Sequence, residues 1–189
     1  MTFLRQAFAA LRLLIVMTVL LGLLYPAVIT VIAQVALKNQ ANGSQITDAQ
    51  GQVVGSALLG QKFDDPTWFQ SRPSASDYSG ETSGGSNLSP ASQKQADARA
   101  QREADLKSAN PDAVGPVPED ALTASASGLD PYVSVAYAQW QVPRVAKARG
   151  MSAADLQSMI AAATDKAVLG YIGQDGVNVT RLNAALANR

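Results

Sequence analysis

The 189-residue sequence contains neither a cysteine nor a histidine. Without cysteine the chain cannot form a disulfide, a thiolate zinc site or an iron–sulfur centre, and without histidine it cannot form a Ser-His-Asp triad. Covalent or metal chemistry would therefore have to depend on Asp, Glu, Ser, Lys or Tyr. The absence of cysteine is compatible with either side of a membrane, so it does not identify a compartment.

The sequence also lacks a net charge and the common nucleotide-binding motif. It has 15 basic and 15 acidic residues, and no G-x-x-x-x-G-K-[ST] loop that would hold phosphates. Asp64 and Asp65 are adjacent and would alternate sides of an extended chain, so we interpret them as solvated turn carboxylates. The residues thus indicate no cofactor or metal of the chain's own.

One group of basic residues is dense enough to consider as a nucleic-acid site. Arg144, Lys147 and Arg149 lie within six positions, just before Gly150. Three charges are too few to indicate nucleic-acid binding. We interpret them as a solvated helix face, or as favourable charge near a helix C-terminus.

A long uncharged run dominates the N-terminal part of the chain. Residues 13–37 read LLIVMTVLLGLLYPAVITVIAQVAL, which is 25 residues without a charge. A helix of this length extends about 37 Å, more than the hydrocarbon core of about 30 Å. A cleaved signal peptide would have a shorter apolar region of about 7 to 15 residues. The run therefore predicts a retained transmembrane helix over residues 13–37, in contact with membrane lipid.

The charges on either side of the run predict its orientation. Arg5 and Arg12 precede it, and the first twelve residues contain no acidic side chain. Positive charge favours the cytoplasmic side of a bacterial inner membrane, whereas a long following domain is translocated largely regardless of its charge. We expect residues 1–12 to be cytoplasmic and residues 38–189 to form an outward-facing, periplasmic domain.

Three residues within the predicted span are suited to contact between membrane helices. Thr18 and Gly22 are small and four residues apart, and Pro26 removes one backbone donor and should bend the axis. We therefore select Thr18, Gly22 and Pro26 as candidate packing residues. The alternative is a single anchor in which Gly and Pro are merely tolerated, since both are common in membrane helices.

The outward part predicts a mixed α+β domain. Residues 45–61 alternate short apolar stretches with turn residues and favour a β-hairpin, and the aromatic residues Phe63, Trp68 and Phe69 are expected to anchor the core. Residues 71–98 contain eight serines and three glycines and predict a polar loop. Residues 89–107 predict a surface helix with Ser89 as its N-cap.

The C-terminal third predicts further helices. The helical stretch predicted over residues 133–150 should bend or break near Pro143. Ser152 and Asp155 form an acidic capping box before an amphipathic helix, whose end we expect at Gly170 and Gly173. A short extended VNV segment then leads to a final helix marked by Leu182 and Leu186.

Several blocks of the sequence together resemble one known family. These blocks are GSALLGQKF, WFQSRPSASDY, SGGSNLSP, PVPEDALTASASGLDPYVS, QVPRVAKARG and VNVTRLNAAL, in this order after the single span. In this respect the chain is similar to the C subunit of the bacterial Kdp potassium-transporting ATPase. The resemblance covers nearly the whole sequence.

The resemblance implies an accessory, non-catalytic subunit of a pump that takes up potassium at high affinity. ATP and potassium would be handled by the ATP-hydrolysing and potassium-translocating subunits, which would be its partners. For this family a catalytic-chaperone role has been proposed, in which the C subunit raises the ATP affinity of the ATP-hydrolysing subunit. The predicted orientation places the domain across the membrane from cytoplasmic ATP, so assembly and stabilisation of the complex is the simpler implication.

The resemblance is densest around residues 116–150, and we select candidate partner-binding residues there. They are Thr123, Ser125, Ser127, Asp130 and Arg144. The hydroxyls and carboxylates of this stretch also fit a purely structural role in turns and helix caps. The competing class of function is a free-standing, membrane-anchored periplasmic binding module or hydrolase.

Overall fold

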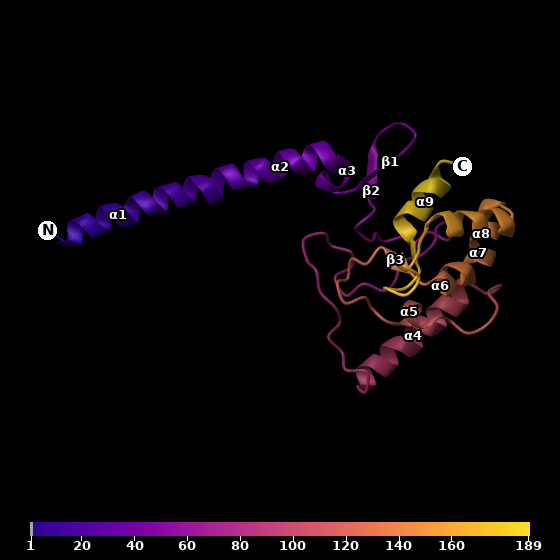
Figure 1. The fold of residues 1–189 in the computed structure, drawn as a ribbon. Helices are drawn as coiled ribbons and strands as arrows, with labels where there is room; N and C mark the ends of the chain where they lie inside the picture. Colours follow the sequence, from indigo (N-terminus) through magenta and orange to yellow (C-terminus); the bar gives the residue numbers. More distant parts are fainter. Residues whose placement is uncertain (1) are drawn as a thin grey trace. The chain divides into compact units, whose positions relative to one another are not determined.

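The computed structural model describes residues 2–189, and the chain divides into two compact units at Ser44 and Gln45. The first unit is mostly one long helix and the second is a mixed domain of helices and short strands (Figure 1). The predicted fold class, a single N-terminal transmembrane helix followed by an α+β domain, is confirmed. The predicted boundary at residue 38 falls on a short helical turn before the division.

The first unit contains a continuous helical stretch from Thr2 to Ala36, which is apolar and long enough to cross a membrane. It comprises α1 (Thr2–Met17), the π-helical segment η1 (Thr18–Leu24) and α2 (Tyr25–Ala36), and the short helix α3 (Lys38–Ala41) follows. None of these helices has a buried residue. An apolar helix that is exposed all round needs another apolar environment, which lipid provides.

Pro26 changes the hydrogen-bond pattern of the helix without ending it. The amide of Tyr25, just before the proline, donates to the carbonyl of Leu20, five residues back. This widened π turn directly precedes the proline, which has no amide hydrogen to donate, and local π adjustments of this kind accommodate proline in membrane helices.

The second unit begins with the predicted β-hairpin. Strands β1 (Gln45–Thr47) and β2 (Val53–Ser56) pair antiparallel, with an irregularity between Ile46 and Thr47. The Asp48 carboxylate closes the turn by accepting the amide hydrogens of Gln50 (3.0 Å) and Gln52 (2.8 Å). The turn is therefore stabilised by its own side chain, as Asp favours.

A long irregular segment connects the hairpin to α4 (Gln93–Ala109). The predicted helix exists and lies on the surface, and its Glu103–Lys107 pair forms at 2.6 Å. Its predicted start is wrong, because Ser92 rather than Ser89 caps the helix by accepting the amide hydrogen of Gln95 at 3.2 Å. The predicted loop of residues 71–98 accordingly ends at residue 92. Ser89 instead forms a turn that precedes the cap.

The remaining elements build the body of the domain. They are α5 (Glu119–Leu122), β3 (Tyr132–Val133), α6 (Val135–Trp140), α7 (Val142–Arg149), α8 (Ala153–Ala162), β4 (Thr164–Asp165), β5 (Gly176–Asn178) and α9 (Val179–Ala187). Strand β5 pairs antiparallel with both β3 and β4, giving the order β3-β5-β4.

Most of the predicted helix boundaries in this body are confirmed. The helical stretch breaks at Gln141, two residues before Pro143, and Gly150 ends α7 with a positive φ of 65°. The Ser152 hydroxyl caps α8 by accepting the amide hydrogen of Asp155. The predicted end of α8 is wrong, because the helix stops at Ala162 and not near Gly170. Strand pairing of Thr164 and Asp165 with β5 ends the helix earlier than the glycines do.

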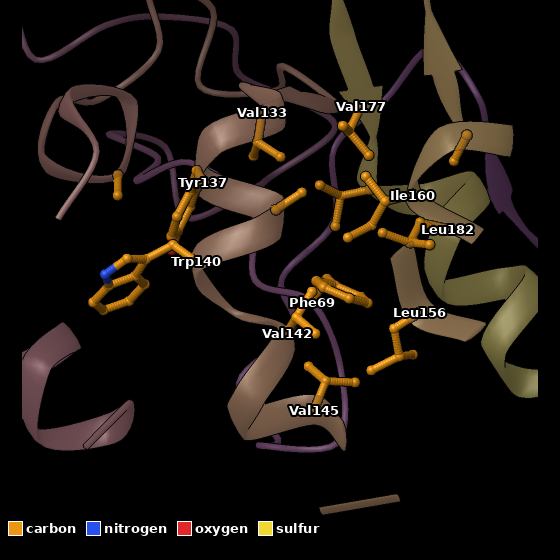
Figure 2. Close-up of a cluster of buried hydrophobic side chains, with 14 of the residues drawn as sticks. Phe69, Val133, Tyr137, Trp140, Val142, Val145, Leu156, Ile160, Val177 and Leu182 are labelled. Atoms are coloured by element: carbon orange, nitrogen blue, oxygen red, sulfur yellow. The ribbon is translucent and has the colours of Figure 1, made fainter. Parts of the chain in front are cut away.

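The core lies where α6, α7, α8 and α9 meet the three-stranded sheet. Phe69 is fully buried among side chains of α7 and α8, including Val142 and Leu156, as Figure 2 shows. Leu182 and Leu186 are also fully buried, which confirms the predicted face of the last helix. Phe63 and Trp68 pack against the cluster while partly buried, so the aromatic group contributes to the core as predicted. Full burial of an apolar side chain such as Phe69 or Leu182 stabilises the fold by roughly 1.5–3 kcal/mol.

Candidate functional site

The segment that carries most of the candidate residues is bound to the polar serine-rich loop by backbone hydrogen bonds. The amide of Ser125 donates to the carbonyl of Pro73 (3.1 Å), and the amide of Gly84 donates to the carbonyl of Ser127 (2.8 Å). The two stretches are therefore held together although about 40 to 50 residues separate them in the sequence. We call the region formed by residues 71–86 and 119–134 the braced loop region.

Side-chain hydroxyls reinforce this pairing. Ser74 Oγ donates to the carbonyl of Gly128 at 2.7 Å, and Ser83 Oγ donates to the carbonyl of Ser127 at 3.1 Å. Ser74 and Ser83 thus satisfy backbone acceptors that would otherwise need water.

Two glycines allow close approach of backbone segments within or beside this region. A Cβ added at Gly60 would lie 2.5 Å from the carbonyl oxygen of Asp130, and one at Gly128 would lie 2.5 Å from Ser76 Oγ. Gly128 also has a φ of 69°, which other residues rarely adopt. Any larger residue at Gly60 would have to displace backbone.

The three predicted hydroxyl residues form local turns and caps. Thr123 Oγ1 donates to the carbonyl of Glu119 at 3.0 Å. Ser125 Oγ accepts the amide hydrogen of Gly128 at 2.9 Å, and Ser127 Oγ accepts that of Leu129 at 3.1 Å. These are the local bonds expected of structural Ser and Thr. A partner contact through these residues stays a prediction.

Asp130 and Arg72 form an ion pair that joins the two stretches of the braced loop region. Asp130 Oδ2 lies 3.1 Å from Arg72 Nη1, and its Oδ1 accepts the amide hydrogen of Tyr132 at 2.9 Å. Arg72 Nη2 lies at 3.5 Å from the carbonyl of Thr123. The Arg72 and Asp130 side chains are about three-quarters buried, at 25% and 28% exposure, so this ion pair is screened less than a surface pair. The structure brings Asp130 and Thr123 together through one arginine.

The sequence places Asp120 among the turn-forming residues of its segment, and we expect neutralising Asp120 and Asp130 to change potassium affinity; the structure adds a structural role for Asp120. Both carboxylate oxygens accept hydrogen bonds from Ser134, from its amide at 2.6 Å and from its hydroxyl at 2.8 Å. The same hydroxyl accepts the amide hydrogen of Tyr137 and so caps α6. The signal in the sequence was the serine N-cap, but its carboxylate partner lies 14 residues away.

Arg144 does not lie with the other candidates, and the solvated-face interpretation is wrong for it. Only 7% of Arg144 is exposed. It donates to Asn110 Oδ1 (2.7 Å), Gln141 Oε1 (2.7 Å) and the carbonyls of Pro66 and Trp68. Burial lowers the pKa of its guanidinium, but arginine remains charged at neutral pH. Arg144 therefore joins the segment from Pro66 to Trp68 and the residue Asn110 to the start of its own helix, from inside the domain.

The other two basic residues of this helix have different surroundings. Arg149 lies 4.1 Å from the centre of the Trp68 ring and donates to the carbonyls of Thr67 and Leu186. The second contact places positive charge at the C-terminus of α9, which is favourable. Lys147 is exposed and pairs with Asp112 at 2.8 Å, so only this residue fits the solvated-face interpretation.

Two open cavities adjoin Arg72. One of about 610 Å³ is lined by both charged and aromatic side chains, among them Tyr78, Arg102 and Asp105. The other, of about 340 Å³, is lined by both acidic and basic residues, among them Asp120, Asp130 and Lys166. Within residues 2–189, no group of three or more acidic residues is arranged to hold a metal ion.

Tyr78 is one of two tyrosines in the lining of the larger cavity, and burial raises the pKa of both Tyr78 and Tyr137. The Tyr78 hydroxyl donates to the carbonyl of Arg72. Desolvation by burial raises the pKa of the Tyr78 phenol to about 12, so it stays protonated at neutral pH. It is a structural hydrogen-bond donor and is not poised to act as a base.

Asp64 and Asp65 are both exposed, as the sequence predicts, but only Asp65 lies in a turn. Asp65 Oδ1 accepts hydrogen bonds from both the amide and the hydroxyl of Thr67, and these bonds lower the pKa of Asp65. Asp64 is exposed and lies 3.7 Å from Lys62. The two carboxylates thus face separate partners.

The candidate membrane-packing residues all lie at or beside the π-helical segment. Thr18 and Gly22 belong to it, and Pro26 follows it in α2. A Cβ at Gly22 would meet only Thr18 Cγ2 at 3.9 Å within this chain. The surface over these residues is therefore open, and contact with another helix through it stays a prediction.

Comparison with known proteins places these observations in one family. The family model described as "KdpC: K+-transporting ATPase, c chain" matches residues 7–188. The "Potassium-transporting ATPase KdpC subunit" of Sorangium cellulosum (strain So ce56) is 49% identical over 180 residues, covering 94% of each chain. The KdpC subunit of Koribacter versatilis is 47% identical and covers 91% of this chain and 89% of its own. That of Herpetosiphon aurantiacus is 47% identical and covers 98% and 95%. The chain therefore belongs to the family of KdpC subunits of potassium-transporting ATPases.

Proposed function

We propose that the chain is a non-catalytic accessory subunit that assembles or stabilises the potassium-transporting ATPase complex. The main support for the proposal is that the polar candidate residues of the braced loop region are hydrogen-bonded within the domain. Thr123, Ser125, Ser127 and Asp130 all bond to groups of the same chain. Side chains held in this way form a rigid surface and are not free nucleophiles or bases.

The helix Thr2–Ala36 supports the membrane part of the proposal. It is apolar and none of its side chains is buried against the rest of the chain. Lipid and the helices of other subunits are therefore suitable surroundings for it. Arg5 and Arg12 favour a cytoplasmic N-terminus and thus a periplasmic domain on the bacterial inner membrane. ATP hydrolysis and potassium movement are assigned to the other subunits.

An outward domain has two ways to influence such a pump. It can lie over the mouth of the potassium pathway, where it fixes loops of the translocating subunit or changes the local potential. It can also raise the ATP affinity of the ATP-hydrolysing subunit, as the chaperone role requires. From the periplasmic side this second effect has to pass through the partner subunits, because ATP binds in the cytoplasm.

Purification in mild detergent tests the subunit assignment. We expect the chain to co-purify with the ATP-hydrolysing and potassium-translocating subunits when all are expressed together. Replacing residues 13–37 with an unrelated apolar helix of the same length serves as a matched control for the anchor. A free-standing binding module or hydrolase would instead leave the membrane alone and monodisperse, which would overturn the proposal.

Orientation is tested separately with a reporter fused after Arg189. A reporter that is active only in the cytoplasm should remain silent, whereas one that needs the periplasm should be active. The reverse pattern would place the domain in the cytoplasm and would make direct contact with bound ATP feasible.

A further inference from the structure

A small hairpin between β4 and β5 presents apolar side chains away from the core. Val168 and Ile172 form an antiparallel bridge with two backbone hydrogen bonds of 2.9 Å each. We call residues 168–172 the apolar tip. Its large side chains are exposed to an unusual degree, with Val168 at 63%, Leu169 at 76%, Tyr171 at 76% and Ile172 at 52%.

The backbone of the tip adds a second unfavourable feature. Leu169 has a φ of 56°, a left-handed conformation that a leucine rarely adopts, and Gly170 follows with a φ of 79°. The domain alone thus exposes apolar area and holds a leucine in a strained conformation. Contiguous exposed apolar groups and local strain both cluster at interaction sites.

The base of the tip is fixed by ion pairs and hydrogen bonds. Lys166 Nζ lies 2.7 Å from Asp175 Oδ2, while Asp175 Oδ1 accepts the amide hydrogen of Ala167 at 3.0 Å. Asp165 pairs with Arg181 at 3.1 Å. The nearest charges are therefore neutralised within the domain, and the tip presents an uncharged apolar surface of fixed shape.

We propose that the apolar tip docks into an uncharged, apolar cleft on another subunit of the same pump. This inference rests on the proposed subunit function and names one of its contact surfaces. The fixed shape favours a protein cleft over lipid, because preorganisation improves binding to a surface that is itself shaped, whereas fluid acyl chains adapt to any apolar loop. The charge-neutral base favours an uncharged partner surface in the same way.

The size of the tip fits a supplementary contact. A stable interface between free proteins uses about 20–30 residues on each side, far more than the tip contains. A chain already tethered by a membrane helix needs less, because the tether raises the effective concentration of the second contact. The anchor and the tip therefore act together in holding the subunit.

The absence of native cysteine provides a clean test. Leu169→Cys introduces a single thiol for a polarity-sensitive fluorophore such as NBD. Gln50→Cys, at the polar turn of the β1–β2 hairpin, is the matched control, because both positions are exposed hairpin turns of the same unit. Emission is compared for the labelled full chain alone in detergent, alone in phospholipid vesicles, and within the co-purified complex. Tyr171→Cys repeats the measurement at a second side chain of the tip.

We expect the Leu169 and Tyr171 labels to shift to shorter wavelength, with severalfold lower iodide quenching, only in the complex, while the Gln50 label stays unchanged. An equal shift in vesicles without the other subunits would mean that lipid covers the tip and would overturn the proposal. Tip labels that remain quenched by iodide in an intact complex would also overturn it, while leaving the subunit function in place. Failure of the unlabelled chain to co-purify would instead refute the proposed function itself.

Discussion

The two units of the chain use apolar residues in opposite ways. The helix Thr2–Ala36 contains most of the large apolar side chains exposed in the chain and has no buried residue. The unit from Gln45 to Arg189 buries a core of large apolar side chains around Phe69, Leu156 and Leu182. The long helix therefore depends on apolar surroundings outside the chain, whereas the second unit is stabilised by its own packing.

The same contrast appears among the basic residues. Arg5 and Arg12 are exposed near the N-terminal end of the long helix, and the predicted orientation depends on their charge. Arg144 is buried and its charge is used to connect segments of the domain. Substitutions in the two units should therefore differ in what they damage.

The largest expected effect is that of Arg144→Ala. The substitution removes the donors to Asn110, Gln141 and two carbonyls, and buried acceptors left without a partner cost about 1–3 kcal/mol each. We expect a loss of about 3–5 kcal/mol in the free energy of unfolding. Urea denaturation of the full chain in micelles, followed by fluorescence of Trp68 and Trp140, measures it. Lys147→Ala, on the exposed side of the same helix, is the control and should change stability by less than about 1 kcal/mol.

The next effect compares leucines of the two units directly. Leu182→Ala creates a cavity in the core and should destabilise the second unit by about 2–5 kcal/mol. Leu21→Ala, at a position that is 64% exposed in the helix, should leave the same tryptophan-detected transition unchanged. A similar loss of unfolding free energy for both variants would contradict the contrast between the two units, because it would show that the helix contributes to folding of the domain.

A smaller effect is expected for Asp120→Asn. An amide can accept only one of the two hydrogen bonds that the carboxylate accepts from Ser134, so the start of α6 is weakened. We expect a loss of about 1–2 kcal/mol in the same denaturation assay. This outcome has to be measured before any change in potassium affinity on neutralising Asp120 is attributed to the potential near the pump. Undiminished stability with altered transport would favour the electrostatic role.

The smallest effect is a change of slope at alkaline pH. The folded chain holds Tyr78 protonated up to about pH 12, whereas an unfolded tyrosine loses its proton near pH 10. The unfolded state therefore binds fewer protons between these values, and stability falls as the pH rises from about 10. Tyr78→Phe should flatten this fall, measured as the free energy of unfolding between pH 9 and 11. An unchanged slope would mean that the phenol is already solvated in the folded protein.

Local patterns in the sequence predicted many elements correctly. The uncharged run predicted the long helix, Ser152 with Asp155 predicted the start of α8, and the spacing of Leu182 and Leu186 predicted the buried face of α9. Each signal acts over a few residues, within the range in which helix caps and amphipathic periodicity operate.

The errors arose where two local signals competed or a distant segment decided. Ser89 followed by Pro90 and Ser92 followed by three non-β-branched residues both suit a helix start, and the structure uses the second. Helix α8 ends at Ala162 because Thr164 and Asp165 pair with β5. The sequence around Gly170 gives no sign of this pairing. Arg144 has the sequence neighbours of a surface residue, and only the packing of Asn110 and Trp68 around it makes it a core residue.

Composition, short periodic patterns and the order of several motifs were enough to predict the long apolar helix, the α+β class and the family. The hydrogen-bond partners of the polar residues, in contrast, could be identified only from the folded domain. Asp120, Asp130 and Arg144 meet their partners across 14, 58 and up to 78 residues. Hydrogen bonds between residues so far apart in the sequence form only when the domain folds, so no local sequence pattern predicts them. The same packing leaves the apolar tip uncovered, and that exposure is what makes it a candidate contact.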